Sequence, residues 1–213
     1  NNALGALTTG TGNTAFGIGA SATITTGSYS TAFGYNAATV NTQPSIVAVG
    51  YNALTANTTG YYNTAVGHSV LPANTTGINN VGVGGGTIEV NTTGSNNTGI
   101  GWNALKANTT ADRNVAVGSS ALAANTTGAS NAAVGMTVMV LNTTGAQNAA
   151  FGNSSLYNNT TASYNTAYGG SSLYGNTTGA NNTALGYYSL FANTTGAQNT
   201  AVGSNALDAN VSS

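Results

Sequence analysis

The chain is almost without charge and entirely without cysteine. Its only charged residues are Glu89, Lys106, Asp112, Arg113 and Asp208, and its single histidine is His68. The absence of cysteine excludes disulfides and thiolate metal sites. Soluble proteins usually have about a quarter charged residues, so Asn, Thr, Ser and the backbone must hydrate this surface. A net charge near zero gives no electrostatic basis for binding nucleic acid or an anionic membrane.

The same inventory argues against an enzyme. General acid–base catalysis needs positioned groups with tuned pKa values, and one histidine with three scattered carboxylates cannot supply a triad or a carboxylate pair. Glu89 and Asp112 also fall at different phases of the repeat described below. His68 has no acidic cluster near it in sequence, so we expect an exposed bystander and no metal ligand. The sequence therefore predicts no catalytic activity, no metal and no cofactor.

Long hydrophobic runs are missing as well. No apolar run approaches the length of about 18 residues that a membrane-spanning helix needs, so we expect no membrane insertion. We identify no signal peptide either. Apolar residues nevertheless make up 40% of the chain and recur periodically, whereas disordered chains are usually poor in them. The chain is therefore expected to fold.

What the chain has in abundance is glycine at a fixed period. The anchor glycines are Gly17, Gly34, Gly50, Gly67, Gly84, Gly101, Gly118, Gly135, Gly152, Gly169, Gly186 and Gly203. Every interval is 17 residues except the 16 between Gly34 and Gly50. A short fixed period is typical of a solenoid, whose units bury their apolar side against their neighbours. We therefore predict one continuous repeat array over residues 1–213.

Each unit contains two segments with the composition of short strands. The residue before the anchor glycine is always large and apolar, as in Val117, and the one before that is Ala or Gly, as in Ala116. Because strand side chains alternate between faces, we expect Val115 and Val117 to point inward and Ala116 outward. A second apolar position follows four residues after the glycine, as in Leu105, and predicts a second strand.

The predicted fold class is therefore all-β. We expect a parallel β-solenoid (β-roll) of about twelve 17-residue coils with two short strands per coil. At about 4.8 Å per rung, such a rod would be roughly 55–60 Å long. The glycines are expected to supply positive φ at the corners.

The small outward position is the predicted contact surface of the rod, because exposed strand residues on a solitary rod should vary. The candidate interface residues are Ala65, Ala116, Ala133, Ala150 and Ala167, which would pack against a partner chain or the rest of their own coil. The segment Asn2-Ala3-Leu4 is in phase with Asn205-Ala206-Leu207, and neither end has a capping segment. This phasing predicts head-to-tail stacking of copies, unless the chain is a fragment of a longer repeat protein.

Nine consecutive units carry Asn-Thr-Thr, which is formally an acceptor for N-glycosylation. The asparagines are Asn57, Asn74, Asn91, Asn108, Asn125, Asn142, Asn159, Asn176 and Asn193. Stacked asparagines can instead hydrogen-bond from coil to coil, and rungs about 4.8 Å apart leave little room for a glycan on each. We favour the asparagine ladder and keep glycosylation of some sites as the alternative. A second asparagine row, beginning at Asn13 and Asn63, lacks the acceptor Thr and is expected to be structural.

Exposed aromatic residues are the best indication of ligand binding. Tyr35, Tyr51, Trp102 and Tyr187 each follow an anchor glycine directly and could stack on sugars or neighbouring fibres. Three units are irregular: one has lost its Thr-Thr-Gly corner, and the others carry Gly84-Gly85-Gly86 and Asp112-Arg113. Drift at solvent-facing corners is the expected reason, and a local ligand site is the alternative.

The repeated phrase resembles that of a known group of surface proteins. Asn114-Val115-Ala116-Val117-Gly118 and Val47-Ala48-Val49-Gly50 are similar to the head repeats of trimeric autotransporter adhesins. The fuller phrase, with Ala-Leu and Asn-Thr-Thr-Gly, also resembles repeat arrays of phage tail fibres. The resemblance implies a left-handed parallel β-roll in an extracellular fibre or adhesin, often trimeric.

The leading hypothesis is a structural subunit of an extracellular or cell-surface fibre with an adhesive role. Its expected partners are other copies of itself, head to tail or as a trimer, and glycans or a host surface. A phage tail-fibre shaft, located on the virion, is one alternative. An ice-binding solenoid is another, but it needs a flat outward array of Thr, and the predicted phase places the strand Thr residues inside.

Overall fold

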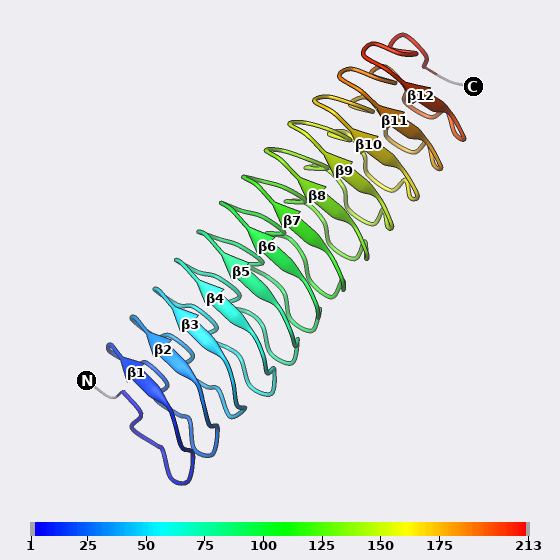
Figure 1. Ribbon diagram of the computed structural model, residues 1–213. Helices are drawn as coiled ribbons and strands as arrows, with labels where there is room; N and C mark the ends of the chain where they lie inside the picture. Colours follow the sequence, from blue (N-terminus) through cyan, green and yellow to red (C-terminus); the bar gives the residue numbers. More distant parts are fainter. Residues whose placement is uncertain (1–2, 212–213) are drawn as a thin grey trace.

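A computed structural model describes residues 3–211, which form one elongated rod (Figure 1). Its strands lie in one parallel sheet in the order of the chain. They are β1 (Thr14–Phe16), β2 (Thr31–Phe33), β3 (Val47–Val49), β4 (Thr64–Val66), β5 (Val81–Val83), β6 (Thr98–Ile100), β7 (Val115–Val117), β8 (Ala132–Val134), β9 (Ala149–Phe151), β10 (Thr166–Tyr168), β11 (Thr183–Leu185) and β12 (Thr200–Val202). The predicted all-β parallel solenoid is confirmed. Asn2, used for the phasing of the ends, lies outside the described residues.

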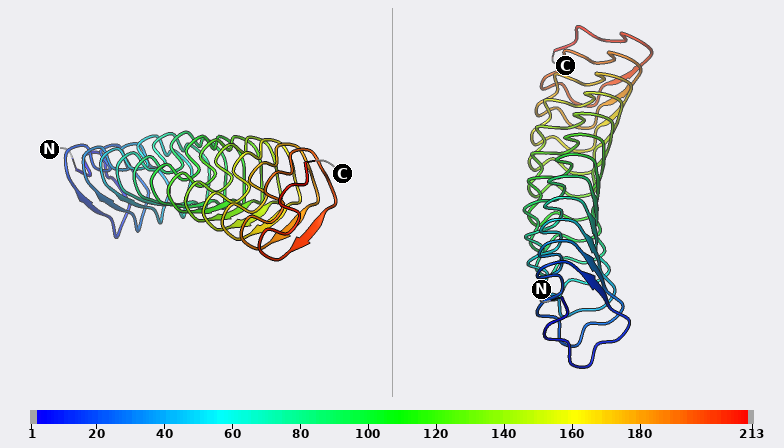
Figure 2. Two further views of the ribbon diagram at one scale, coloured as in Figure 1. Left: turned by 90° about the horizontal axis from the view of Figure 1, so that it is seen from above. Right: turned by 90° about the vertical axis from the view of Figure 1, so that its left-hand side faces the viewer.

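The 17-residue period is the register of this sheet. Ala116 of β7 pairs with Ala133 of β8, and the same alignment of the small central residue holds for every neighbouring pair of strands. The shortened unit keeps it, because Ala32 pairs with Ala48 after 16 residues. The sheet occupies one side of the rod, and turns form the rest of each coil (Figure 2).

The prediction of two strands per coil is wrong. The segment around Leu105 is a turn, and Leu105 itself has the left-handed backbone conformation, with φ of 52°. This conformation directs the Leu105 N–H along the rod, where it donates to the carbonyl of Ala121 in the next coil over 3.0 Å. Left-handed geometry costs about 1–2 kcal/mol for a non-glycine residue. Complete burial of the leucine side chain contributes about 1.5–3 kcal/mol and offsets that cost.

The predicted inside–outside phase of the strand is also wrong. Ala116 is fully buried and Val115 is 39% exposed, so the small residue points inward and its large neighbours point outward. The reason is the narrow interior, which the apolar residues of the opposite wall fill. A Cβ built on Gly82, the equivalent of Ala116 two coils earlier, would collide with the Val70 side chain. At Gly82 not even the methyl group of Ala fits without a shift, and the coils with more room hold nothing larger than Ala at this position.

The candidate interface alanines therefore have another role. Ala65, Ala116, Ala133, Ala150 and Ala167 are all fully buried in the hydrophobic core of the rod. They pack against the rest of their own coil and its neighbours, so they are not an oligomer interface. The inward position of the second apolar residue is confirmed, because Leu54, Leu71, Ile88 and Leu105 are fully buried.

The anchor glycine is required for two reasons. Gly118 has φ of 133°, as predicted for a corner, and an added Cβ would overlap the carbonyl of Gly135 in the next coil. The glycine of the Asn-Thr-Thr-Gly corner is required only for space. Gly60 is not at positive φ, but a Cβ there would overlap the carbonyl of Gly77.

Candidate functional site

The asparagines of the Asn-Thr-Thr segments form a buried ladder inside the rod. Asn125 donates one side-chain N–H to Oδ1 of Asn108 over 3.1 Å and the other to the carbonyl of Gly128 over 2.9 Å. The same pair of bonds recurs in each of the nine units at Asn57, Asn74, Asn91, Asn108, Asn125, Asn142, Asn159, Asn176 and Asn193. Every one of these residues is fully buried. A glycan on Nδ2 is therefore incompatible with the folded coil, and the ladder is the correct interpretation.

The second asparagine row is structural as well. Asn114 donates its backbone N–H to Oδ1 of Asn97 over 3.0 Å, and its Nδ2 donates to the carbonyl of Gly128 over 2.9 Å. Gly128 thus accepts one hydrogen bond from each row. Buried amides with all their partners in place rigidify a core, so the two rows hold the Thr-Thr-Gly corner in position.

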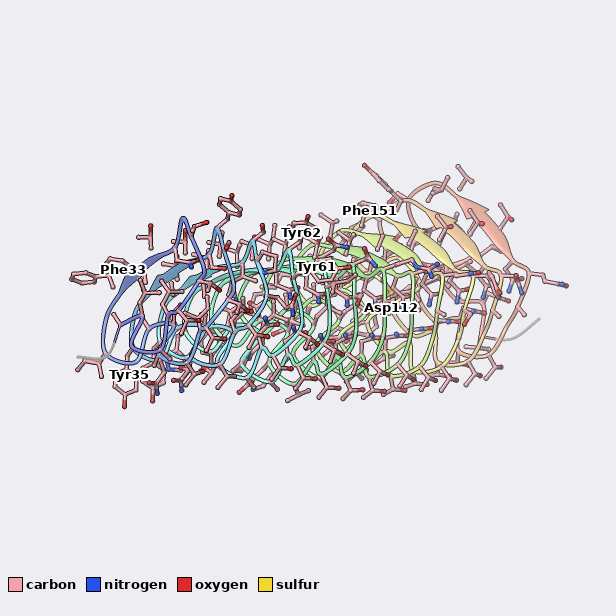
Figure 3. The ribbon with its side chains drawn as sticks, turned by 90° about the horizontal axis from the view of Figure 1, so that it is seen from below. Phe33, Tyr35, Tyr61, Tyr62, Asp112 and Phe151 are labelled. Carbon is pink, nitrogen blue, oxygen red and sulfur yellow. The ribbon has the colours of Figure 1, made fainter. Side chains whose placement is uncertain are left out.

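The aromatic row that follows the anchor glycines begins with a stack. The rings of Tyr35 and Tyr51 lie 5.4 Å apart and inclined by 9°, and those of Tyr51 and His68 lie 5.0 Å apart and inclined by 11°. The three rings therefore turn their faces along the rod and cover one another. Tyr35 remains 47% exposed and points away from the rod (Figure 3). Tyr51 can offer no free face to a sugar, and His68 is part of this stack.

Trp102 and Tyr187, from the same row, have different surroundings. Tyr187 lies beside Tyr188 with ring centroids 4.3 Å apart. A side-chain hydrogen bond with Tyr188 raises the pKa of Tyr187 above its ordinary value of 10.0, and desolvation contributes less. Trp102 is 62% exposed, and within residues 3–211 no aromatic ring stacks on it. Of the four predicted aromatic residues, it is the one whose ring has no aromatic neighbour and can contact another molecule.

A second aromatic row was missed from the sequence. Tyr157, Tyr174 and Phe191 each lie five residues after an anchor glycine, and their rings stack at 5.0 and 5.2 Å. Tyr188 stacks on Phe191 at 4.5 Å and joins this row to Tyr187. The spacing of 17 residues was the available signal, because side chains one period apart meet in adjacent coils.

Two of the charged residues form an ion pair by the same rule. Glu89 and Lys106 are one period apart, and Nζ of Lys106 lies 3.4 Å from Oε2 of Glu89. Asp112 binds the backbone of the preceding coil, where its Oδ1 accepts a hydrogen bond from the Ser95 N–H over 2.7 Å. In the part of the chain that the structure describes, no three His, Asp or Glu residues gather as a metal site would require. No helix there is long and apolar enough to cross a membrane.

The outer face of the sheet is uncharged and open, with large apolar side chains beside its threonines. Its outward residues include Val83, Ile100 and Val115, each 36–41% exposed. Phe16 and Phe33 stack on this face at 5.0 Å, and Phe151 and Tyr168 lie 5.6 Å apart with a hollow of about 310 Å³ beside them. A row of large apolar side chains on a surface usually marks a contact with another molecule.

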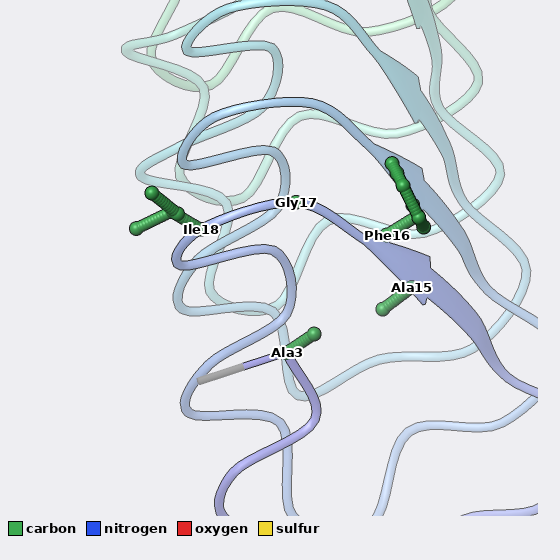
Figure 4. Close-up of a pocket in the computed structure, with 5 residues that line it drawn as sticks. All are labelled: Ala3, Ala15, Phe16, Gly17 and Ile18. Carbon is green, nitrogen blue, oxygen red and sulfur yellow. The ribbon is translucent and has the colours of Figure 1, made fainter. Parts of the chain in front are cut away.

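The first coil contains a second hollow, of about 360 Å³, lined by Ala3, Ala15, Phe16, Gly17 and Ile18. Figure 4 shows Ala3 and Ala15 pointing toward one another across the coil, while Ile18 points away. The lining carries no charged side chain and no hydroxyl group. Its chemistry is that of an incompletely filled apolar core, without groups that could act on a substrate.

Comparison of the chain with protein-family models, curated proteins and solved structures found no match.

Proposed function

We propose that this chain is a structural segment of an extracellular fibre. The observation that carries the proposal is the rod itself, in which one parallel sheet runs from β1 to β12 and two asparagine rows run without interruption through the coils from β4 onward. A solenoid built of nearest-neighbour contacts can be lengthened without redesign, which suits a shaft. The proposal includes no catalysis, because no three His, Asp or Glu residues gather within residues 3–211.

Self-association is part of the proposal, through the ends of the rod or its sheet face. A coil at either end presents N–H and C=O groups that further coils, or another copy, can pair with. The sheet face supplies a lateral contact, because Val83, Ile100 and Val115 leave apolar surface in water. A trimer closed around three such faces and a filament of end-to-end copies both use these surfaces.

The location is tested by immunoelectron microscopy of intact cells of the source organism with an antibody against the folded rod. We expect label along fibres on the outside of unpermeabilised cells. Label on the tail fibres of released virus particles would instead favour a phage tail-fibre shaft, in which the rod has the same mechanical role. Label confined to the cell interior would contradict the proposal.

Ice binding is a second candidate, because the corrected strand phase exposes threonine. Seven strands begin with an outward Thr: Thr14, Thr31, Thr64, Thr98, Thr166, Thr183 and Thr200. The equivalent position is Val in three strands and Ala in two, on a sheet without charged residues and with rungs about 4.8 Å apart. Thermal hysteresis of the purified protein, with Thr64→Lys and Thr98→Lys as disrupting variants, tests this function. A freezing point equal to the melting point excludes it.

A further inference from the structure

Most of the charged residues of this chain fall in one stretch of its sequence. Four of the five, Glu89, Lys106, Asp112 and Arg113, fall in the same stretch of sequence as Trp102, the single tryptophan. The rest of the array has one further charged residue, Asp208, on a surface of Asn, Thr, Ser and apolar side chains. Adjacent coils around β5 and β6 are therefore chemically distinct from the others, although their backbone repeats the same fold.

The indole of Trp102 lies against a glycine of the preceding coil. A Cβ built on Gly85 would lie 2.6 Å from Cζ3 and 2.8 Å from Cε3 of Trp102, closer than real Cβ atoms approach. Any larger residue at 85 would push the ring away. In the equivalent row, Tyr35 and Tyr51 turn their ring faces along the rod. We expect the indole of Trp102, in the same row, to turn its faces along the rod in the same way. One face then lies against Gly85, and the other is directed at Ser119 of the next coil, which has no ring to cover it.

Polar groups of different kinds meet at the next residue along the chain, Gly86. A Cβ built on Gly86 would lie 2.6 Å from Oδ1 of Asn103 and 3.7 Å from Oε2 of Glu89. Lys106 is held there by its ion pair with Glu89, and the two side chains remain 49% and 35% exposed. Gly85 thus lies against the indole, and the adjoining Gly86 lies against the amide of Asn103 and near the carboxylate of Glu89, which holds the ammonium group of Lys106.

We propose that this constellation is a saccharide-binding site. The apolar C–H face of a pyranose ring stacks on the open indole face, while Glu89, Asn103 and Lys106 bind its hydroxyl groups. The ion pair neutralises the carboxylate, which favours a neutral sugar over a cation or an anion. Tyr187 lies near Gly170 in a similar way, but Tyr188 covers its ring and its coil has Phe191 in place of a charged residue. The site would give the proposed fibre its adhesive role. It rests on the proposed function in one respect only, that the sugar belongs to a surface to which the fibre attaches.

Because Trp102 is the single tryptophan, its fluorescence reports on this site alone. The test titrates the purified chain with trisaccharides of glucose, galactose and N-acetylglucosamine, using tetramethylammonium and sulfate as charged probes. We expect a saturable change in emission with at least one trisaccharide, at a Kd of about 1 mM. Glu89→Gln should weaken that binding about tenfold, because it removes a charge-assisted hydrogen bond.

Asp208→Asn is the matched control, since Asp208 occupies the same position of the last coil and lies far from Trp102 along the rod. It should bind as tightly as the unaltered chain. Trp102→Ser, which imitates Ser119, should keep the β-sheet circular dichroism and lose binding in isothermal titration calorimetry. An unchanged emission with every trisaccharide, a response to a charged probe alone, or equal affinity in Glu89→Gln and Asp208→Asn overturns the site. If the protein binds no sugar but forms intact fibres in electron micrographs, the saccharide site is wrong and the proposed structural function is still supported.

Discussion

Asn142 donates its side-chain amide to Oδ1 of Asn125 across 2.8 Å, from one coil to the next. Asn125 does the same toward Asn108, so each side chain is acceptor and donor at once. Both residues are fully buried, where an amide without partners would cost free energy. The row therefore ties coils together only while it is complete.

Breaking this row should destabilise the rod strongly. Asn125→Asp replaces a donor with a carboxylate that faces the acceptor oxygens of Asn108 and Gly128. We expect a loss of at least about 3 kcal/mol in the free energy of unfolding. Asn153→Asp is the control, because Asn153 is exposed and its Oδ1 only accepts a hydrogen bond from Ser154. Urea denaturation followed by circular dichroism compares them, and equal midpoints would show that the ladder contributes nothing.

Two glycines of similar surroundings in sequence should respond differently to alanine. Gly118→Ala forces a Cβ onto the Gly135 carbonyl at a φ that L-residues avoid, so we expect several kcal/mol of destabilisation, about 3 or more. Gly170→Ala places its Cβ 3.4 Å from Tyr187, an ordinary contact, and should change stability by less than about 1 kcal/mol. Thermal melting of the two variants measures the difference. The packing of the anchor glycines is misdescribed if Gly118→Ala melts like the unaltered chain.

The sequence was sufficient for the period, the parallel stacking and the ladder, because each follows from residues that recur 17 positions apart. It failed at the strand, where Val115 and Val117 seemed the natural core residues. The coil is too narrow for large side chains from both walls, and Leu105 and its equivalents already fill it from the turn. The signal was the restriction to Ala or Gly at the central position beside a neighbour that varies among Phe, Val, Ile, Tyr and Leu.

The second strand was predicted wrongly for a related reason. Leu105 adopts a left-handed conformation that its own preferences oppose, and only the stacked neighbours make it favourable. The grouping of Trp102 with Glu89 and Lys106 was likewise hidden, since it depends on side chains one coil apart and on the small residues Gly85 and Gly86.

The corrected phase of the strand makes a sharp prediction. Ala116→Asp buries an unpaired carboxylate in the core and should prevent folding or cost several kcal/mol, about 4. Val115→Asp, one residue away on the exposed face, should cost less than about 1.5 kcal/mol. Chemical denaturation of both variants decides between the two orientations of the strand, and a larger loss for Val115→Asp would reverse the assignment of inside and outside.

The outward sheet face should govern lateral association. Ile100→Lys together with Val83→Lys places two like charges on adjacent strands of that face. We expect the rod to remain folded and its mass in solution to fall to that of fewer copies, because copies would then repel each other. Multi-angle light scattering measures the mass. Thr127→Lys, on an exposed corner away from the strands, should leave it unchanged, and an equal effect of both changes would remove the sheet face as the contact.

The most direct test of the account is cryo-electron microscopy of the native full-length protein in its assembled form. The predicted result is a fibre in which one-strand coils are stacked along the long axis with a rise of about 4.8 Å per coil, the buried asparagine rows running parallel to that axis. A compact particle, or a fibre whose coils do not stack along its length, would contradict the claim that this solenoid is a structural segment of an extracellular fibre.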